Sequence, residues 1–123
     1  MYEKRHIRYK SIFVSGTDKE SVDLKGEGIV EIGDKVKIAF ETDGYKIEVI
    51  YSEDEVILKN NQSKLKLVKD KMVLNEYQLP YGTTLLKTKL QKMKCSHNSL
   101  NLKYELYEST SLISTVYIVI NII

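Results

Sequence analysis

Apolar and polar residues alternate with a period of two along most of this chain, and apolar residues at helical spacing are hard to find. The clearest alternating sets are Val36, Ile38 and Phe40; Tyr45, Ile47, Val49 and Tyr51; Leu100, Leu102, Tyr104 and Leu106; and Val116, Ile118, Ile120 and Ile122. Because successive side chains of a strand point to opposite faces, each set marks one face of a β-sheet. The pattern predicts an all-β protein.

Turn-forming residues separate these alternating runs. Asp43-Gly44 is the clearest hairpin signal, because a two-residue type I′ turn needs positive φ at both central residues and these two tolerate it. Further breaks fall at Ile32-Gly33-Asp34, Ser52-Glu53-Asp54, Asn60-Asn61 and Pro80-Tyr81-Gly82. The spacing predicts about ten strands, at residues 5–14, 22–32, 35–41, 45–51, 55–59, 64–68, 71–77, 83–92, 99–107 and 114–122.

So many short strands fit either a β-sandwich or an antiparallel up-and-down β-barrel. We favour a barrel of about 8–10 strands, because closure removes the sheet edges that promote aggregation. The sequence ends on the apolar pair Ile122-Ile123, which predicts that the last strand is held in the sheet beside the first strand. A chain of 123 residues suits a single domain spanning residues 1–123.

The distribution of charge argues against nucleic-acid binding. Arg5 and Arg8 are the only arginines among 19 basic residues, and the lysines are spread along the chain. Arginine is the usual side chain for phosphate and guanine recognition, whereas dispersed lysines keep the outer face of a sheet solvated. The longest apolar run, residues 116–120, is too short to span a membrane. A single cysteine, Cys95, and a charged N-terminal stretch without the pattern of a secretory signal predict a cytoplasmic protein.

The sequence contains no recognisable motif for catalysis, a metal ion or a cofactor. Cys95 and His97 are too few for a structural zinc site, and no orienting group for a nucleophile and base is evident beside them. The acidic run Glu53-Asp54-Glu55 lacks the spacing of a calcium loop. Gly26-Glu27-Gly28 precedes no helical pattern, so it predicts a bulge or sharp bend in a strand rather than a phosphate loop. We therefore expect no metal and no cofactor, and an enzyme acting at the barrel mouth is the least favoured class of function.

Several short segments resemble the YwiB-like family of small bacterial proteins of unknown function. They are Lys-Ile-Ala-Phe-Glu-Thr-Asp-Gly at 37–44, Lys-Ile-Glu-Val at 46–49 with Val-Ile-Leu-Lys at 56–59, Tyr-Gln-Leu-Pro-Tyr-Gly-Thr-Thr-Leu-Leu-Lys-Thr-Lys-Leu at 77–90, and Leu-Asn-Leu-Lys-Tyr-Glu-Leu at 100–106. That family is similar to the calycins, which are lipocalin-like β-barrels, so the resemblance implies a barrel and no particular activity. The chain departs from the family pattern at Leu79, where threonine is common, and at Lys59-Asn60-Asn61, where Arg-x-Gly is usual.

Nine tyrosines, with two phenylalanines and no tryptophan, predict a barrel interior that is partly polar. A tyrosine buries its ring and keeps a hydroxyl that needs a partner or water. We expect a small, partly polar ligand to contact Tyr45, Tyr51, Thr84, Thr88 and Tyr104. The alternative is that these side chains fill a narrow barrel completely. Fatty-acid binders of the calycin group hold the carboxylate with arginines in the last strands, and no arginine follows Arg8, which argues against a tight fatty-acid site.

The alternation fails in the last strand, where Tyr117 and Val119 are apolar on the face opposite the core set. Both faces of this strand therefore need cover. With Ile50 and Tyr107 as possible extensions, the pattern predicts a homodimer or a protein-binding sheet face. The competing interpretation is that the N-terminal strand or a loop folds over it. Two functions follow, a carrier or sensor of a small molecule, which we favour, and a filled barrel that acts as an interaction or structural module.

Overall fold

The computed structural model describes residues 2–60, 63–79 and 81–123. In chain order, these residues form the ten strands β1 Tyr2–Ser15, β2 Asp18–Ile32, β3 Val36–Thr42, β4 Tyr45–Tyr51, β5 Glu55–Asn60, β6 Ser63–Val68, β7 Met72–Leu79, β8 Gly82–Cys95, β9 Ser99–Glu108 and β10 Ser111–Ile122. Each strand expected from the alternation is present, and β1, β2, β8 and β10 each extend three or more residues past a predicted bound. The all-β class is confirmed, and no helix in the described ranges is long and apolar enough to cross a membrane.

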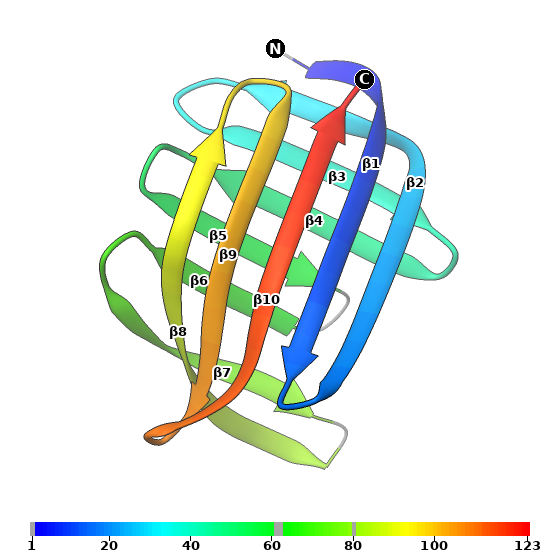
Figure 1. Ribbon diagram of the computed structural model, residues 1–123. Coiled ribbons are helices and arrows are strands. Elements are labelled where there is room, and N and C mark those ends of the chain that lie inside the picture. Colours follow the sequence, from blue (N-terminus) through cyan, green and yellow to red (C-terminus); the bar gives the residue numbers. More distant parts are fainter. Residues whose placement is uncertain (1, 61–62, 80) are drawn as a thin grey trace.

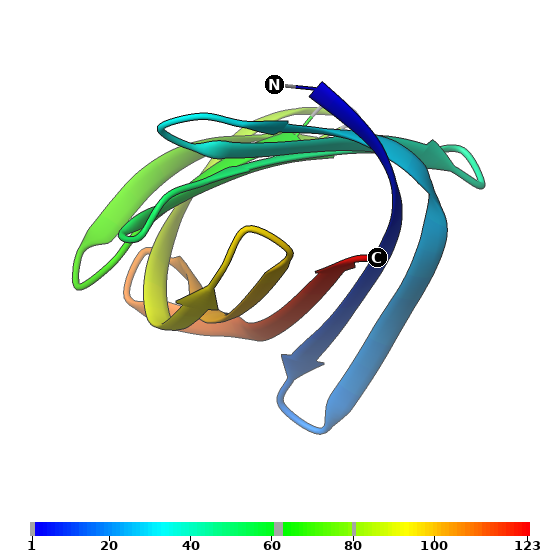
Figure 2. The same cartoon turned by 90° about the horizontal axis from the view of Figure 1, so that it is seen from above.

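The strands form one antiparallel sheet in the order β6-β5-β4-β3-β2-β1-β10-β9-β8-β7, which curls into a nearly closed barrel (Figures 1 and 2). The last strand pairs with the first, in a register that runs from Ile7 opposite Ile122 to Val14 opposite Thr115. The pairing continues to the end of the chain, where the backbone N–H of Ile123 donates to the carbonyl of His6 at 2.8 Å. The predicted up-and-down barrel and the predicted neighbours of the last strand are both confirmed.

The seam of the barrel lies elsewhere, between β6 and β7, which are the two edges of the sheet. These strands follow each other in the chain and touch through a tight turn, in which the N–H of Lys71 donates to the carbonyl of Val68. Beyond that turn the described residues of β6 and β7 do not form a ladder of backbone hydrogen bonds. The side chains of Asn75 and Thr88 reach the backbone of Lys66 instead. Side-chain contacts thus join the two edges.

The upper part of the barrel, near the C-terminus, is packed with apolar side chains. Residues that solvent does not reach at all include Ile7, Val30, Val56, Leu67, Leu100 and Ile120. They come from alternate positions of six strands, as the period of two requires. At this end the hydroxyl of Tyr51 donates to the carbonyl of Ser96 at 2.7 Å, which ties β4 to the β8–β9 turn across the interior. This part of the barrel has a continuous core.

The glycines of β2 allow a close approach between strands. A Cβ atom at Gly28 would lie 2.7 Å from both the carbonyl oxygen of Ala39 and the Cβ of Phe40. Gly28 pairs with Arg5 on one side and with Phe40 on the other, at the point where β3 joins β2. The shifts in strand register lie in the β8–β9 pair and in the β9–β10 pair, and not at Gly28. The glycines therefore mark close packing, and the bulge that the sequence offered as one alternative is not found there.

The Asp43-Gly44 hairpin has the conformation that its sequence predicts, with φ of 50° at Asp43 and 81° at Gly44. Positive φ at both central residues is the property of a type I′ turn, whose twist matches that of the flanking strands. Two other predicted turns include Asn61 and Pro80, which lie outside the described residues.

Candidate functional site

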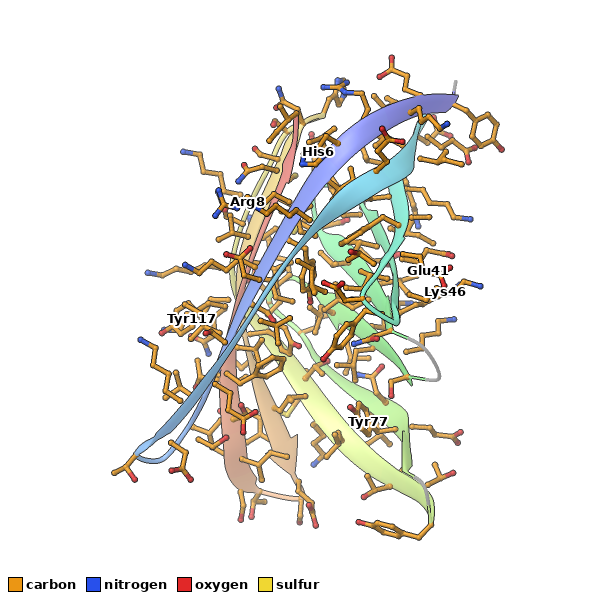
Figure 3. All side chains as sticks on the ribbon, turned by 90° about the vertical axis from the view of Figure 1, so that its right-hand side faces the viewer. His6, Arg8, Glu41, Lys46, Tyr77 and Tyr117 are labelled. Carbon is orange, nitrogen blue, oxygen red and sulfur yellow. The ribbon has the colours of Figure 1, made fainter. Side chains whose placement is uncertain are left out.

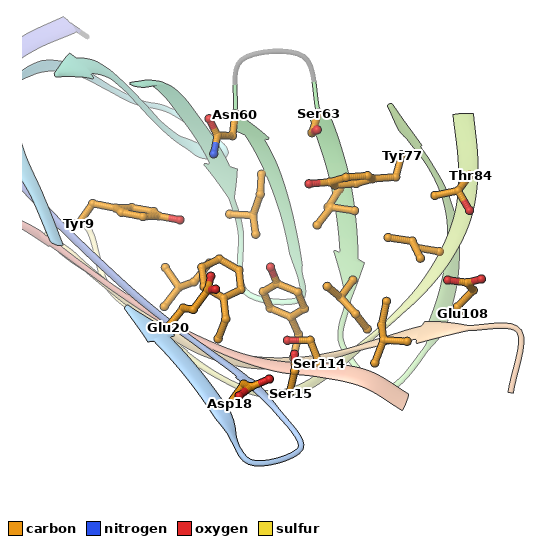
Figure 4. Close-up of a pocket in the computed structure, with 18 residues that line it drawn as sticks. Tyr9, Ser15, Asp18, Glu20, Asn60, Ser63, Tyr77, Thr84, Glu108 and Ser114 are labelled. Carbon is orange, nitrogen blue, oxygen red and sulfur yellow. The ribbon is translucent and has the colours of Figure 1, made fainter. Parts of the chain in front are cut away.

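A cavity of about 580 Å³ occupies the end of the barrel away from the C-terminus (Figure 4). Its mouth is formed where hairpins turn, so Ser15 of β1, Asn60 of β5, Ser63 of β6 and Glu108 of β9 all line it. Along the barrel axis, the packed core occupies the end near the C-terminus and the cavity occupies the other end. A barrel filled along its whole length is therefore not what this sequence builds.

The wall of the cavity is mostly apolar. It is built from inward-facing positions of six strands, among them Phe13, Leu58, Leu65, Leu86, Leu106 and Ile118. Such a wall favours a ligand with an apolar body, because burial of apolar surface is the main source of affinity in pockets of this size.

Three tyrosines bring hydroxyl groups into this apolar space. Tyr9, Tyr77 and Tyr104 line the cavity from β1, β7 and β9, and Figure 4 shows Tyr9 and Tyr77 on facing walls. Burial raises the pKa of Tyr104 far above its ordinary value, and the nearby Tyr9 and Tyr77 raise it further. Burial also raises the pKa of Tyr9, against an opposing effect of Ser11. Tyr9 and Tyr104 therefore stay neutral at physiological pH and can donate hydrogen bonds.

The hydroxyl of Tyr104 has no partner in the described part of the chain. The residue is 3% exposed, and no described side chain or backbone group forms a hydrogen bond with its oxygen. Every fully buried side-chain oxygen and nitrogen of the described residues has a partner, so the Tyr104 oxygen remains in contact with the cavity space. A buried hydroxyl without a protein partner needs water or a ligand group, because leaving it unpaired is costly.

Carboxylates lie on two of the strands that form the mouth. Asp18 and Glu20 of β2 and Glu108 of β9 line the cavity, while none of its described lining residues is lysine, arginine or histidine. All three carboxylates are exposed, and none of them forms an ion pair with a described residue. The mouth is therefore locally negative in a chain whose net charge is +2.

The structure places the five predicted ligand residues in different surroundings. Thr84 and Tyr104 line the cavity. Thr88 is fully buried at the seam, where its hydroxyl donates to the carbonyl of Lys66 at 2.8 Å. Tyr51 lies at the opposite end of the barrel. Tyr45 is 39% exposed and is not among the cavity residues.

Sequence reasoning missed Tyr9, Tyr77 and the acidic mouth. Tyr9 alternates with Ile7 in the first strand, so its inward orientation was available from the pattern. The depth of each residue along the barrel was not, because alternation identifies a face and carries no information on height.

The opposite end of the barrel holds Cys95 and His97 in a separate depression. The Cys95 thiol lies 3.9 Å from the carbonyl of Ser52 and is half-buried. No group of three or more potential metal ligands occurs among the described residues.

The predicted interface residues divide between two parts of the outer surface. Tyr117 is 40% exposed and Val119 is 38% exposed on the outer face of β10, and Figure 3 shows Tyr117 pointing away from the barrel. Tyr107 lies on the adjacent β9, and the ammonium of Lys103 sits 5.4 Å from the ring centre of Tyr117. Ile50 lies on β4, and three strands separate it from β10. Tyr107, Tyr117 and Val119 therefore lie on adjacent strands, and Ile50 lies apart from them.

Comparison with known proteins shows the fold. No family model matches the chain, and no curated protein matches its sequence. Among solved structures, the chain is similar to the crystal structure of the ywiB protein from Bacillus subtilis, with a TM-score of 0.75 over 98% of this chain and 92% of that chain. The two sequences are 17% identical. The barrel implied by the resemblance to YwiB-like proteins is thus confirmed: the chain has the fold of the ywiB protein.

Proposed function

We propose that this barrel binds a small, partly polar molecule in the cavity between Tyr9, Tyr77 and Tyr104. The single observation that carries the proposal is the buried hydroxyl of Tyr104, which lines a cavity of about 580 Å³ and has no described protein partner. Cavities of about 300–1,000 Å³ with apolar walls and a few polar groups are typical of small-molecule sites.

The lining of the cavity supports the same function. Its apolar wall contributes affinity, and the three hydroxyls set the orientation of a ligand group that accepts or donates hydrogen bonds. We also propose that the chain belongs to the YwiB-like family and is related through it to the calycins. The barrel that the chain shares with the ywiB protein supports this relationship.

The test is mass spectrometry under native conditions on protein purified from its own host. We expect a small molecule to remain bound, and we expect Thr84→Phe to lose it, because this side chain lines the cavity and a larger ring fills it. The matched control is Thr83→Phe, since Thr83 is the exposed neighbour on the same strand and does not line the cavity. A ligand-free protein, or equal retention by the two variants, would count against binding in the cavity.

A second candidate is a protein-interaction module that acts through the outer face of β10. It is favoured by Tyr117 and Val119, two apolar side chains that are each well exposed on neighbouring outward positions. We expect a homodimer in light scattering at high protein concentration, and Val119→Lys to dissociate it. A monodisperse monomer in that experiment would contradict this candidate.

A further inference from the structure

The carboxylates at the mouth of the cavity face open space. Asp18, Glu20 and Glu108 all line the cavity, and no described basic residue pairs with any of them. Figure 4 shows the side chains of Asp18 and Glu20 at the wall of the mouth, with Glu108 farther along it. An acidic rim alone does not define a site. Here it borders a cavity into which the unpartnered hydroxyl of Tyr104 opens.

The spacing of the carboxylates suits a bulky cation better than a metal ion. Strands β1 and β10 lie between β2 and β9, and neighbouring strands are about 4.8 Å apart, so the strand of Glu108 lies about 14 Å along the curved sheet from the strand of Asp18 and Glu20. No group of three or more potential ligands is close enough to hold a metal among the residues described. A charge placed inside the mouth is nevertheless within about one Debye length, roughly 8–10 Å, of the carboxylates on both sides.

The wall below the rim complements an organic cation. The rings of Tyr9, Phe13 and Tyr104 line the cavity, and aromatic faces attract ammonium groups. The apolar remainder of the wall favours a hydrocarbon body attached to that charge. An anionic ligand would instead meet three carboxylates and no described positive group in the lining.

We infer that the ligand is a small amine or quaternary ammonium compound with an apolar body, whose positive charge lies at the rim formed by Asp18, Glu20 and Glu108. This inference rests on the proposed function and adds the charge of the ligand to it. A preference for cations over anions would identify the rim as its cause. The chain as a whole carries a net charge of +2, so a non-specific charge effect would favour anions.

The test uses three probes that share one apolar body: 4-phenylbutylamine, 4-phenyl-1-butanol and 4-phenylbutyrate. Binding is measured by isothermal titration calorimetry at about 20 mM and about 500 mM salt, since salt screens charges near the surface. We expect the amine to bind most tightly and the carboxylate least tightly at low salt, about fivefold or more apart, because exposed ion pairs are individually weak and three of them contribute. High salt should narrow that gap.

Two triple variants each remove three negative charges. One removes them from the rim of the cavity, and the other removes them from exposed positions outside it. Asp18→Asn/Glu20→Gln/Glu108→Gln should abolish the preference for the amine, so that the amine and the alcohol bind with similar affinity, since the near-isosteric amides remove the three negative charges of the rim. The control Asp34→Asn/Glu53→Gln/Glu76→Gln changes exposed residues that do not line the cavity and should keep the preference. Circular dichroism verifies that both variants fold.

The outcomes separate this inference from the function on which it rests. If the alcohol binds and the amine has no advantage, or if the preference survives in the rim variant, the positive charge is wrong and cavity binding stands. If none of the three probes binds, the cation inference is overturned. The proposed function is then judged on its own test, the molecule retained from the host and its loss in Thr84→Phe.

Discussion

The side-chain amide of Asn75 pairs with the backbone of Lys66 as a neighbouring strand would. Its Oδ1 accepts from the N–H of Lys66 at 2.8 Å, and its Nδ2 donates to the carbonyl of Lys66 at 3.2 Å. The hydroxyl of Thr88 donates to the same carbonyl and lies 3.0 Å from the Asn75 Nδ2. Because β6 and β7 are the edges of the sheet, this one amide satisfies backbone groups that no ladder reaches.

Asn75→Ala should therefore open the seam of the barrel. The N–H of Lys66 loses its acceptor while its carbonyl keeps Thr88, so we expect the free energy of unfolding to fall by about 1–3 kcal/mol, the cost of one unsatisfied polar group. Urea unfolding measures the loss, and hydrogen exchange should show faster exchange of the Lys66 amide.

The control for this substitution is Asn101→Ala, the same change at an exposed position of β9. It should alter stability by no more than about 0.5 kcal/mol. Equal effects of the two substitutions would mean that the amide of Asn75 does not hold the seam.

Gly28→Ala should destabilise the barrel, since its Cβ would lie 2.7 Å from the backbone oxygen of Ala39, which cannot move without breaking the sheet. Overpacking of this kind costs about 1–3 kcal/mol. Gly33→Ala is the matched control, because a Cβ at Gly33 meets nothing within 4 Å and the residue does not have positive φ. Thermal unfolding of the two variants compares them, and a Gly28→Ala protein as stable as Gly33→Ala would contradict the close approach.

Alkaline pH should weaken the fold through Tyr51. Burial, and secondly the charge of Cys95, raises the pKa of Tyr51 from 10.0 to about 12. The unfolded chain releases this proton near pH 10 and the folded chain retains it to about pH 12, so the free energy of unfolding falls across that window and is unaffected below it. Urea midpoints at about pH 9, 10 and 11 follow the loss.

Tyr51→Phe tests the origin of that pH dependence. The variant starts less stable, because it loses the hydrogen bond to Ser96, yet its stability should fall less steeply above pH 10. Some dependence remains, since burial also raises the pKa of Tyr9 and Tyr104. Identical slopes for the variant and the parent protein would assign the effect to other groups.

The strands and their neighbours could be predicted from sequence because the signals are local. Period-two alternation and turn residues such as Asp43-Gly44 define ribbons, and a chain of consecutive hairpins leaves few ways to order them. The pairing of β1 with β10 followed from the need to protect edges. The seam did not follow, because Asn75 and Thr88 close it through polar side chains that the sequence alone does not distinguish from lumen residues.

The candidate site was predictable only in part, for a geometric reason. Tyr51 and Tyr104 both occupy inward positions of alternating strands, so the pattern treats them alike. In the barrel, Tyr51 closes one end and Tyr104 opens into the cavity at the other. Height along the axis depends on how strands are staggered, and stagger is a property of register that alternation does not encode.

That difference leads to a prediction in which one chemical change has two outcomes. Tyr104→Phe and Tyr51→Phe each remove a single hydroxyl from a side chain that is almost fully buried. Tyr51→Phe should cost about 1 kcal/mol of stability, because its hydroxyl donates to the carbonyl of Ser96. Tyr104→Phe should change stability by less than about 0.5 kcal/mol, because no described group is left unpaired when its hydroxyl is lost.

The same pair of variants should show the reverse order in ligand binding. The affinity for 4-phenyl-1-butanol should fall about fivefold in Tyr104→Phe, the loss of one hydrogen bond to a neutral group, and remain unchanged in Tyr51→Phe at the far end of the barrel. Calorimetry and urea unfolding on the two proteins give both comparisons. If Tyr104→Phe is as destabilising as Tyr51→Phe and binds the alcohol normally, then its hydroxyl serves the fold, and the cavity loses the group on which its polar recognition depends.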